Sequence, residues 1–560
     1  MTSDDPSWFF ARVGSVEDRP LLGNGVSVIT RVRISNFRLF GDFEIEPRAG
    51  LNILVGDNEA GKSTILQALT LVLTGRSNGR SATDELTPDW FHRPAVLQFF
   101  EDYAAADPQP PPTIEIEVYL VDGDDKLQKH RGVHNSRGED CPGLRLTIEP
   151  SADYAAEIRE YLDAEDCPRA VPVEYYDVHW RNFADEPLSR RPAGLGHVLI
   201  DSRTIRSQRG VDYHTRQLLH DFIEPDERAA ISVAHRRARH EISTTYLDKA
   251  NERIAKHDEL VEGRAVEIDF DQGGASSWHG SIIPRIDEVP FALAGQGVQA
   301  AMKIALAMSR SVEQTSFVLI EEPENHLSHT RLMRLVASIE ALAGERQSFL
   351  TTHSSFVLNR LGIDRLLLLG PAGIVTRLTD LPADTVRYFQ KLSGFDTLRL
   401  VLAERLVLVE GPSDEIVFER FFRDRYDRGP HEAGVDVVSL RGVALRRSLE
   451  LCAALDRHVI ALRDNDGKVP DHWIEPLRPL LSDGRRQIEI GDPSDGATLE
   501  PQLVRANGES PLRSALSLDA RDDVTDWMSE NKTESALRIL ESPETLNPPP
   551  YIQRALDLLR

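Results

Sequence analysis

The stretch GDNEAGKST at residues 56–64 is the most informative in the chain. It follows the apolar run LNILV and precedes STILQALTLVL, a segment typical of a helix. A G-x-x-x-x-G-K-[ST] loop between a buried strand and a helix surrounds phosphate oxygens with backbone N–H groups. We therefore predict a nucleotide site with Lys62 on the β- and γ-phosphates and Ser63 on Mg²⁺. Its residues are Gly56, Asn58, Gly61, Lys62, Ser63 and Thr64.

Further along the chain, three segments can complete this nucleotide site. FVLIEEPENHL (residues 317–327) ends an apolar run in Glu321 and Glu322, which can hold the Mg²⁺ shell and orient an attacking water. LTTHSS (350–355) places His353 at the end of another strand, and LAGQGVQ (293–299) is a Gly-rich turn at a helix start that contains Gly295. Helix and strand patterns alternate between these segments, which favours a parallel sheet.

A second group of acids follows two apolar strands near the end of the chain. Glu410 ends RLVLV, Asp414 begins a helix, and Asp464 and Asp466 end HVIAL. Residues i and i+2 of an extended segment point to one side, and ligands of α/β sheets collect at the carboxyl ends of the strands. If the two strands are adjacent and parallel, Glu410, Asp464 and Asp466 come together. Such clustered charges require cations, and hard oxygen ligands suit Mg²⁺ or Mn²⁺.

The order of the nucleotide-site motifs resembles that of ABC-type ATPases of the SMC, Rad50 and RecF kind. The resemblance implies that Glu321 belongs to Walker B, that Glu322 orients water and that His353 is the switch histidine. It also implies that the signature turn around Gly295 closes over nucleotide held by a second subunit, which predicts a homodimer or higher homo-oligomer. Ala294 stands where the family has a signature serine, and Glu321 where it has Asp. Binding of ATP with Mg²⁺ is therefore a firmer expectation than fast hydrolysis.

The E…DxD order of the late acids resembles the TOPRIM fold. An ABC-type ATPase followed by TOPRIM resembles the OLD (overcoming lysogenisation defect) nucleases, which include the nuclease subunit of the Gabija antiphage system. The likeness extends from about residue 28 to the end. A topoisomerase would need a tyrosine nucleophile in a breakage domain, and the eleven tyrosines show no such arrangement. A primase would usually carry a zinc ribbon, which Cys141, Cys167 and Cys452 cannot form.

This resemblance implies two further site residues. ATLEPQLV (497–504) resembles an acidic family segment that makes Glu500 a metal ligand, and NKTESALRIL (531–540) makes Lys532 the cation near the scissile phosphate. The implied chemistry is hydrolysis of DNA with two Mg²⁺ or Mn²⁺ ions, regulated by ATP. The implied metal ligands are Glu410, Asp414, Asp464, Asp466 and Glu500. Antiphage defence is the implied role, with a UvrD-like helicase as a possible partner.

Two other functions remain open at this point. One is a non-cleaving, ATP-dependent DNA clamp or repair factor of the RecF or SMC type. The other is a sensor or scaffold for a partner effector. The formal charge of −25 argues against a generally adhesive nucleic-acid binder, although local basic clusters would suffice for DNA.

The predicted fold class is α/β, with an ABC-type (SMC/RecF-like) P-loop ATPase domain, a helical insertion and a TOPRIM domain. We expect an N-terminal extension at 1–27, the ATPase at 28–204 and 263–395, and a possible dimerisation arm at 205–262. The TOPRIM domain with a C-terminal helical segment is expected at 396–560. No signal peptide or membrane span is evident in the sequence, and the predicted location is cytoplasmic.

Overall fold

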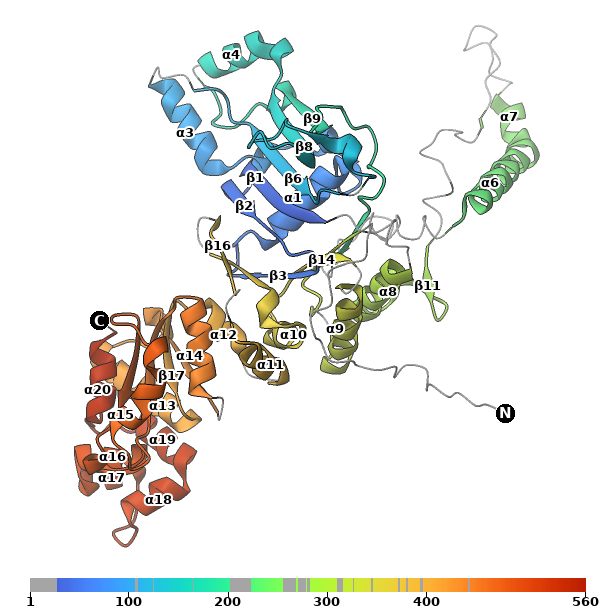
Figure 1. Cartoon of the computed structure of the whole chain (residues 1–560). Coiled ribbons are helices and arrows are strands. Elements are labelled where there is room, and N and C mark those ends of the chain that lie inside the picture. Colours follow the sequence, from blue (N-terminus) through green and yellow to red (C-terminus); the bar gives the residue numbers. More distant parts are fainter. Residues whose placement is uncertain are drawn as a thin grey trace, which may run out of the picture. The chain divides into compact units, whose positions relative to one another are not determined.

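The computed structural model describes residues 28–105, 109–123, 125–164, 166–201, 223–254, 268–269, 278, 283–309, 316–325, 327–343, 346–370, 373–378, 381–392, 396–441 and 444–559. Contacts divide the chain into two compact units (Figure 1). One comprises Met1–Asn52 and Ser63–Thr351, and the other comprises Ile53–Lys62 and Thr352–Arg560. The expected N-terminal extension at 1–27 lies outside the described residues.

The first unit begins with an antiparallel sheet. Its strand order is β2-β1-β6-β8-β7, with β9 also paired to β8. The bounds are β1 Ile29–Phe37, β2 Phe40–Ile45, β6 Ile114–Leu120, β7 Arg131–Gly132, β8 Cys141–Pro150 and β9 Tyr176–Asn182. Alternating apolar and polar residues in VSVITRVRISNFRLFGDFEIEP, before the P-loop strand, predict a β-hairpin with its turn at Gly41. The hairpin is confirmed by the pairing of β1 with β2. The predicted position of the turn is wrong, because Phe37 pairs with Phe40 and Gly41 lies within β2.

The same unit holds three parallel strands, β10 (His197–Asp201), β13 (Phe317–Glu321) and β14 (Gln347–Thr351), with β13 in the middle. Every residue of β13 and β14 is buried, as expected for strands of a parallel sheet. The helices α8 (Gln296–Ser309) and α9 (His329–Ala343) precede and follow β13. This confirms the predicted alternation of helix and strand.

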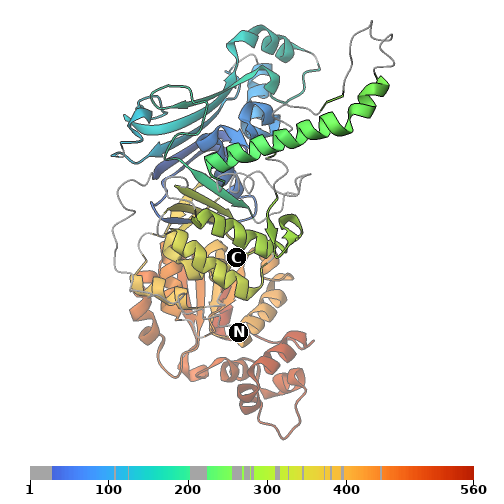
Figure 2. The ribbon, with the colours of Figure 1, turned by 90° about the vertical axis from the view of Figure 1, so that its right-hand side faces the viewer.

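A long helix, α6 (Pro225–Tyr246), occupies the middle of the stretch expected to be helical (Figure 2). It starts at a capping box formed by Glu224 and Glu227, and α7 (Asp248–Ile254) follows. None of the α6 residues is buried, which agrees with a solvated surface helix. The remaining parts of the predicted 205–262 arm, at 205–222 and 255–262, lie outside the described residues. The dimerisation role stays a prediction.

In the second unit, the P-loop strand β3 (Leu51–Gly56) pairs in parallel with β15 (Leu366–Leu369), and β15 pairs antiparallel with β16 (Val375–Arg377). The helices α10 (Ser355–Leu361), α11 (Ala383–Lys391) and α12 (Thr397–Leu402) follow in the sequence. Directly before β3, the Gly50 carbonyl accepts from Ser348 N at 3.0 Å. The predicted strand at LNILV is therefore confirmed.

A four-stranded parallel sheet with the order β18-β17-β19-β20 forms the C-terminal part of the second unit. Its strands are β17 Arg405–Val409, β18 Asp436–Ser439, β19 His458–Arg463 and β20 Arg486–Ile490. The helix α13 (Pro412–Tyr426) packs against β17, β18 and α19 (Lys532–Glu541), and α20 (Pro550–Asp557) packs against β19 and β20. Apolar side chains of this sheet and of the surrounding helices share one core, which includes Val407, Phe418, Leu503 and Ile552. The core joins the strands that carry the late acids to the C-terminal helices.

The structure contains further α-helices in both units. They are α1 Lys62–Thr74, α2 Ala82–Glu85, α3 Arg93–Ala104, α4 Ala155–Asp163, α14 Leu445–Ala454, α15 Pro470–Ile474, α16 Leu499–Asn507, α17 Glu509–Leu516 and α18 Val524–Glu530. Small two-stranded pairs are β4 (Arg76–Ser77) with β5 (Arg80–Ser81), and β11 (Arg285–Ile286) with β12 (Val289–Pro290). Within the described ranges, no helix combines the length and apolar character needed to span a bilayer.

Candidate functional site

The P-loop lies between β3 and α1, the strand and the helix that its motif predicts. Gly56 is needed at the end of β3, because an added Cβ would lie 2.8 Å from the Leu369 carbonyl oxygen. Gly61, at the start of α1, has a left-handed φ of 89°. The buried Lys62 ammonium donates to the carbonyls of Gly56 at 2.8 Å and Asp57 at 2.9 Å. The lysine thus directs two of its three donors to carbonyls of its own loop.

The end of β13 brings an acid to the start of α1. The Ser63 hydroxyl donates to the Glu321 carboxylate, which joins the P-loop serine to the first acid of the EE pair. Glu322 has a left-handed φ of 43°, and its carboxylate accepts from Asn325 Nδ2 at 2.8 Å. The pair of Ser63 and Glu321 is the combination expected for a Mg²⁺ shell. Thr64, the last residue of the predicted loop, is buried within α1.

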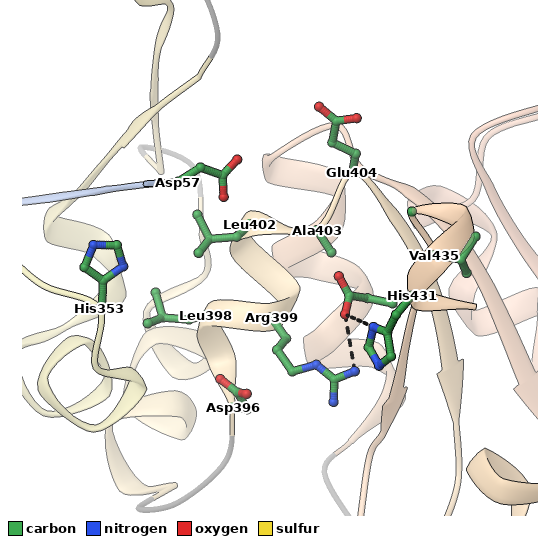
Figure 3. Close-up of a pocket in the computed structure, with 12 residues that line it drawn as sticks. Asp57, His353, Asp396, Leu398, Arg399, Leu402, Ala403, Glu404, His431 and Val435 are labelled. Carbon is green, nitrogen blue, oxygen red and sulfur yellow. Dashed lines mark hydrogen bonds and ion pairs between the residues drawn. The ribbon is translucent and has the colours of Figure 1, made fainter. Parts of the chain in front are cut away.

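A cavity of about 510 Å³ opens beside the P-loop in the second unit, and His353 lines it together with Asp57 (Figure 3). Its other wall comes from α12 and the region of β18. Arg399 Nη2 donates to Asp436 Oδ1 at 3.3 Å and to the Val437 carbonyl at 2.8 Å. The cavity therefore places the predicted switch histidine in one pocket with a side chain tied to β18.

The other predicted nucleotide-site residues lie in the loops expected for them. Asn58 is exposed in the P-loop, and Gly295 directly precedes α8. A Cβ at Gly295 would meet no heavy atom within 4 Å. The signature turn is thus an open surface at the start of a helix.

The late acids gather at the carboxyl end of the C-terminal sheet. β17 and β19 are adjacent and parallel, as predicted, with Leu408 opposite Ala461. Glu410 directly follows β17, and Asp464 directly follows β19. Asp414 sits in the first turn of α13, where its Oδ2 accepts from Gly411 N at 3.0 Å. Like negative charges therefore meet at one end of the sheet.

The DND loop (residues 464–466) is fixed by a buried amide rather than by an extended strand. Asn465 is fully buried, and its Nδ2 donates to the Gly496 carbonyl at 2.7 Å. Asp466 N donates to the Ala497 carbonyl at 3.1 Å. Asp466 itself has a left-handed φ of 50°, so the expectation that it continues an extended segment is wrong. The turn is favoured because Gly467 follows with a φ of 75°.

Glu500 and Lys532 come from two helices and form an ion pair. Glu500 lies in the first turn of α16 and accepts from Thr498 Oγ1 at 2.7 Å. Lys532, the first residue of α19, places its Nζ 3.4 Å from Glu500 Oε1. The Glu500 side chain is 4% exposed and that of Lys532 is 53% exposed. The lysine thus faces solvent over a buried carboxylate.

Burial and mutual repulsion make this group of acids resist ionisation. The pKa of Asp464 is raised to about 8, first by burial and then by the charges of Asp414, Glu410 and Glu500. Burial, with the charges of Glu410 and Glu500, raises the pKa of Asp414 to about 6. Burial also raises the pKa of Glu410, against the opposing effect of Arg463. A cation bound among these acids would offset both the free-energy cost of burying their charges and their mutual repulsion.

The donor chemistry fits a hard divalent cation. The buried oxygens Glu410 Oε1 and Asp464 Oδ1 have no hydrogen-bond partner. Among the described residues, however, no group of three or more His, Cys, Asp or Glu side chains is arranged so that it could hold a metal ion. Arg463 lies among these acids, with its guanidinium 3.7 Å from Glu410 Oε1 and 3.5 Å from Asp466 Oδ2.

Two residues of this region were not predicted from the sequence. Arg463 ends β19, and a charged residue directly before the DND turn was the available signal. Tyr551 of α20 is fully buried, and its pKa is raised well above the usual value by burial and then by Asp414, Asp464 and other acids of the group. Nothing local in the sequence marks Tyr551, since it lies far from these acids along the chain.

Three segments of the chain match known protein families. Residues 401–466 match the family "Overcoming lysogenization defect protein-like, TOPRIM domain". Residues 31–139 match "AAA domain", and residues 282–359 match "AAA domain, putative AbiEii toxin, Type IV TA system". Together with the two parallel sheets, these matches confirm the predicted fold class of an ATPase domain followed by TOPRIM.

Individual relatives agree with this assignment. An OLD nuclease of Thermus scotoductus is 25% identical over 467 residues, which cover 78% of this chain and 82% of the relative. The Rad50 ATPase of Methanopyrus kandleri is 52% identical over 50 residues, 9% of this chain and 6% of the relative. A RecF protein of Stenotrophomonas maltophilia is 49% identical over 49 residues, 9% of this chain and 14% of the relative. The chain is thus a homologue of OLD nucleases, with shorter likeness to Rad50 and RecF.

Proposed function

We propose that this homologue of OLD nucleases hydrolyses DNA phosphodiesters at the acids of its TOPRIM domain, with divalent cations as cofactor and ATP as regulator. The observation that carries the proposal is the group of Glu410, Asp414, Asp464 and Glu500, whose acids are wholly or partly buried and repel one another. A purely structural surface would not require several acids with raised pKa values at one sheet edge. Such clusters are typical of sites that bind cations or move protons.

The residues that would hold one or two Mg²⁺ or Mn²⁺ ions are Glu410, Asp414, Asp464, Asp466 and Glu500. When bound, such ions lower the pKa of water and neutralise charge that develops on phosphate oxygens. Lys532 adds a fixed positive charge beside Glu500, and this charge is suited to the developing negative charge of the scissile phosphate. The buried Asn465 keeps the DND turn in place while cations and substrate bind.

ATP is proposed to act through the P-loop side of the second unit. Lys62 donates to the carbonyls of Gly56 and Asp57, so a phosphate that binds its ammonium also acts on this loop. Asp57 lines the same cavity as His353 and Arg399, and Arg399 contacts the start of β18 through Asp436. A change in this loop on nucleotide binding is therefore in direct reach of the TOPRIM sheet. The closing of the Gly295 turn over nucleotide in a second subunit, and a role of Glu322 in hydrolysis, belong to the same proposal.

Antiphage defence is the biological role that we propose for this activity. It rests on the likeness to an OLD nuclease and to the TOPRIM family named for the lysogenisation defect. A test is the plating efficiency of a panel of phages on cells that express the wild-type chain or Asp464→Ala. Protection by the wild type alone would support the role, and equal plating on both would contradict it. The comparisons give no support for a helicase partner.

Cleavage itself is tested with purified full-length protein and supercoiled plasmid, with Mg²⁺ or Mn²⁺ and with or without ATP. The wild type should nick or linearise the plasmid, and Asp464→Ala should lose this activity at equal folding. Asp471→Asn is the matched control, because Asp471 is an exposed acid on the nearby helix α15. Intact plasmid with the wild type under every condition would favour a non-cleaving DNA clamp. Equal nicking by Asp464→Ala would place the activity elsewhere.

A further inference from the structure

Arg463 is a charged residue of the acidic region that no proposed step uses. It is the last residue of β19 and directly precedes Asp464. Its guanidinium bridges two strand ends, with Nη1 3.7 Å from Glu410 Oε1 and Nη2 3.5 Å from Asp466 Oδ2. Both separations exceed the usual length of an N–H···O hydrogen bond, about 2.7–3.2 Å. The contacts are therefore electrostatic and easily exchanged.

An indole ring holds this guanidinium from the other side. The Arg463 Cζ lies 3.8 Å from the centroid of the Trp473 ring, and Lys468 Nζ lies 4.9 Å from the same centroid. The ring is itself fixed, because Trp473 Nε1 donates to the Asn465 carbonyl at 3.0 Å. Arg463 Nε is buried and has no hydrogen-bond partner. The arginine thus has an aromatic support that does not depend on the acids.

Three of the five acids form ion pairs with two different cations. Lys532 faces Glu500, and Arg463 faces Glu410 and Asp466. A divalent ion bound by Glu410 or Asp466 would repel a guanidinium a few ångströms away. Since arginine does not lose its proton in proteins, the guanidinium can respond only by moving. Its planar set of donors matches two oxygens of a phosphate.

We propose that Arg463 is a built-in counter-ion of the acidic site, which a divalent cation displaces from Glu410 and Asp466, and which then binds a backbone phosphate of the DNA beside Trp473. This inference rests on the proposed function and deepens it. It adds a residue that links cation binding to contact with the DNA backbone. Before the cation binds, Arg463 offsets part of the negative charge of two acids that would otherwise repel the phosphate.

The first test is a titration of nucleotide-free, full-length protein with Mn²⁺ by calorimetry. Arg463→Gln should bind Mn²⁺ about three- to tenfold more tightly than the wild type, because a competing cation is removed. Arg463→Lys should lie nearer the wild type, because it keeps the charge. Arg478→Gln is the matched control, since Arg478 pairs with the exposed Glu475. Equal or weaker Mn²⁺ binding by Arg463→Gln would overturn the proposal.

A second readout follows the arginine itself. The fluorescence of Trp473, taken as the difference between the wild type and Trp473→Phe, should change when Mn²⁺ is added. In the Arg463→Gln background this change should disappear, because no guanidinium moves beside the ring. A Mn²⁺-dependent change of equal size in Arg463→Gln would contradict displacement of the arginine.

The phosphate contact is tested by DNA binding in Ca²⁺ over a range of salt concentrations, with intact DNA verified on gels. Arg463→Gln should bind DNA more weakly and reduce the steepness of the log–log salt dependence by about one. An unchanged slope would refute the phosphate contact. Asp464→Ala separates the two proposals. If it binds Mn²⁺ like the wild type, the proposed metal site fails; if it loses Mn²⁺ while Arg463→Gln shows no gain, only the role of Arg463 fails.

Discussion

Divalent cations should release protons when they bind to the acidic site of the metal-free protein. The pKa of Asp464 is about 8 and that of Asp414 is about 6. At pH 7 the first carboxyl therefore carries about 0.9 proton and the second about 0.1, whereas a cation binds only the ionised forms. Binding should then release about one proton at pH 7, about 1.5 at pH 6 and about 0.1 at pH 9.

The sign of the pH dependence follows from the same numbers. Because protons compete with the cation, the apparent affinity should rise with pH. The rise is about tenfold per unit near pH 7 and levels off above the Asp464 pKa of about 8. Without a cation, the raised pKa values mean that these carboxyls stabilise the fold less as pH increases. Stability from this source is fully present below the unfolded pKa values and is lost as pH rises through about 6 and about 8.

The assay is calorimetric titration with Mn²⁺ in buffers of equal pH and different ionisation enthalpy. The dependence of the observed heat on that enthalpy gives the number of protons released. Asp464→Asn should lower the release at pH 7 to about 0.1 proton wherever binding persists. Asp471→Asn, which changes an exposed acid, should behave as the wild type. A release near zero at pH 7 that stays constant from pH 6 to pH 9 would refute the shared, desolvated acid group.

Three further predictions concern the rest of the chain. Lys62→Ala should lose binding of a fluorescent ATP analogue, and retained affinity would contradict the P-loop assignment. Arg420→Met should destabilise the C-terminal part by about 2–4 kcal/mol, because buried Arg420 donates to three carbonyls at and beyond the end of α19. The measurement is thermal unfolding, and an unchanged melting temperature would refute this. Arg399→Ala should keep ATP binding and cleavage without ATP but weaken the effect of ATP on cleavage, and an undiminished effect would exclude the cavity as the route.

Much of the fold was predictable because local patterns and topology agree. The P-loop required a buried strand and a helix, and β3 and α1 provide them. The apolar runs before Glu410 and Asp464 predicted neighbouring parallel strands, and the register of β17 with β19 confirms them. A short motif that fixes backbone geometry therefore also predicts the strands and helices that flank it. The roles of the individual site residues stay predictions.

The remaining features depend on strand register, long-range hydrogen bonds and side-chain rotamers, which a local sequence pattern does not encode. Gly41 was placed at the hairpin turn, but the pairing of Phe37 with Phe40 leaves the turn to the two residues before β2. Asp466 leaves the extended conformation because Asn465 anchors the turn to a carbonyl 31 residues later. The ion pairs of Arg463 depend on its side-chain rotamer. Tyr551 reaches the acids only through the packing of α20.

The buried Asn465 also has a consequence for how this region can vary. Its hydrogen bonds to Gly496 and Gly467, with the bond from Asp466 to Ala497, close the base of a long excursion of the chain. The acids lie at or outside this closure, whereas α15 and the following turn lie within it. The excursion also contains β20, which pairs with β19, so the part of it that can vary without disturbing the sheet is the segment around α15. Trp473 lies in that segment and carries the effect of a change there to Arg463. Under the proposal for Arg463, contact with the substrate can then change with no substitution among the acids.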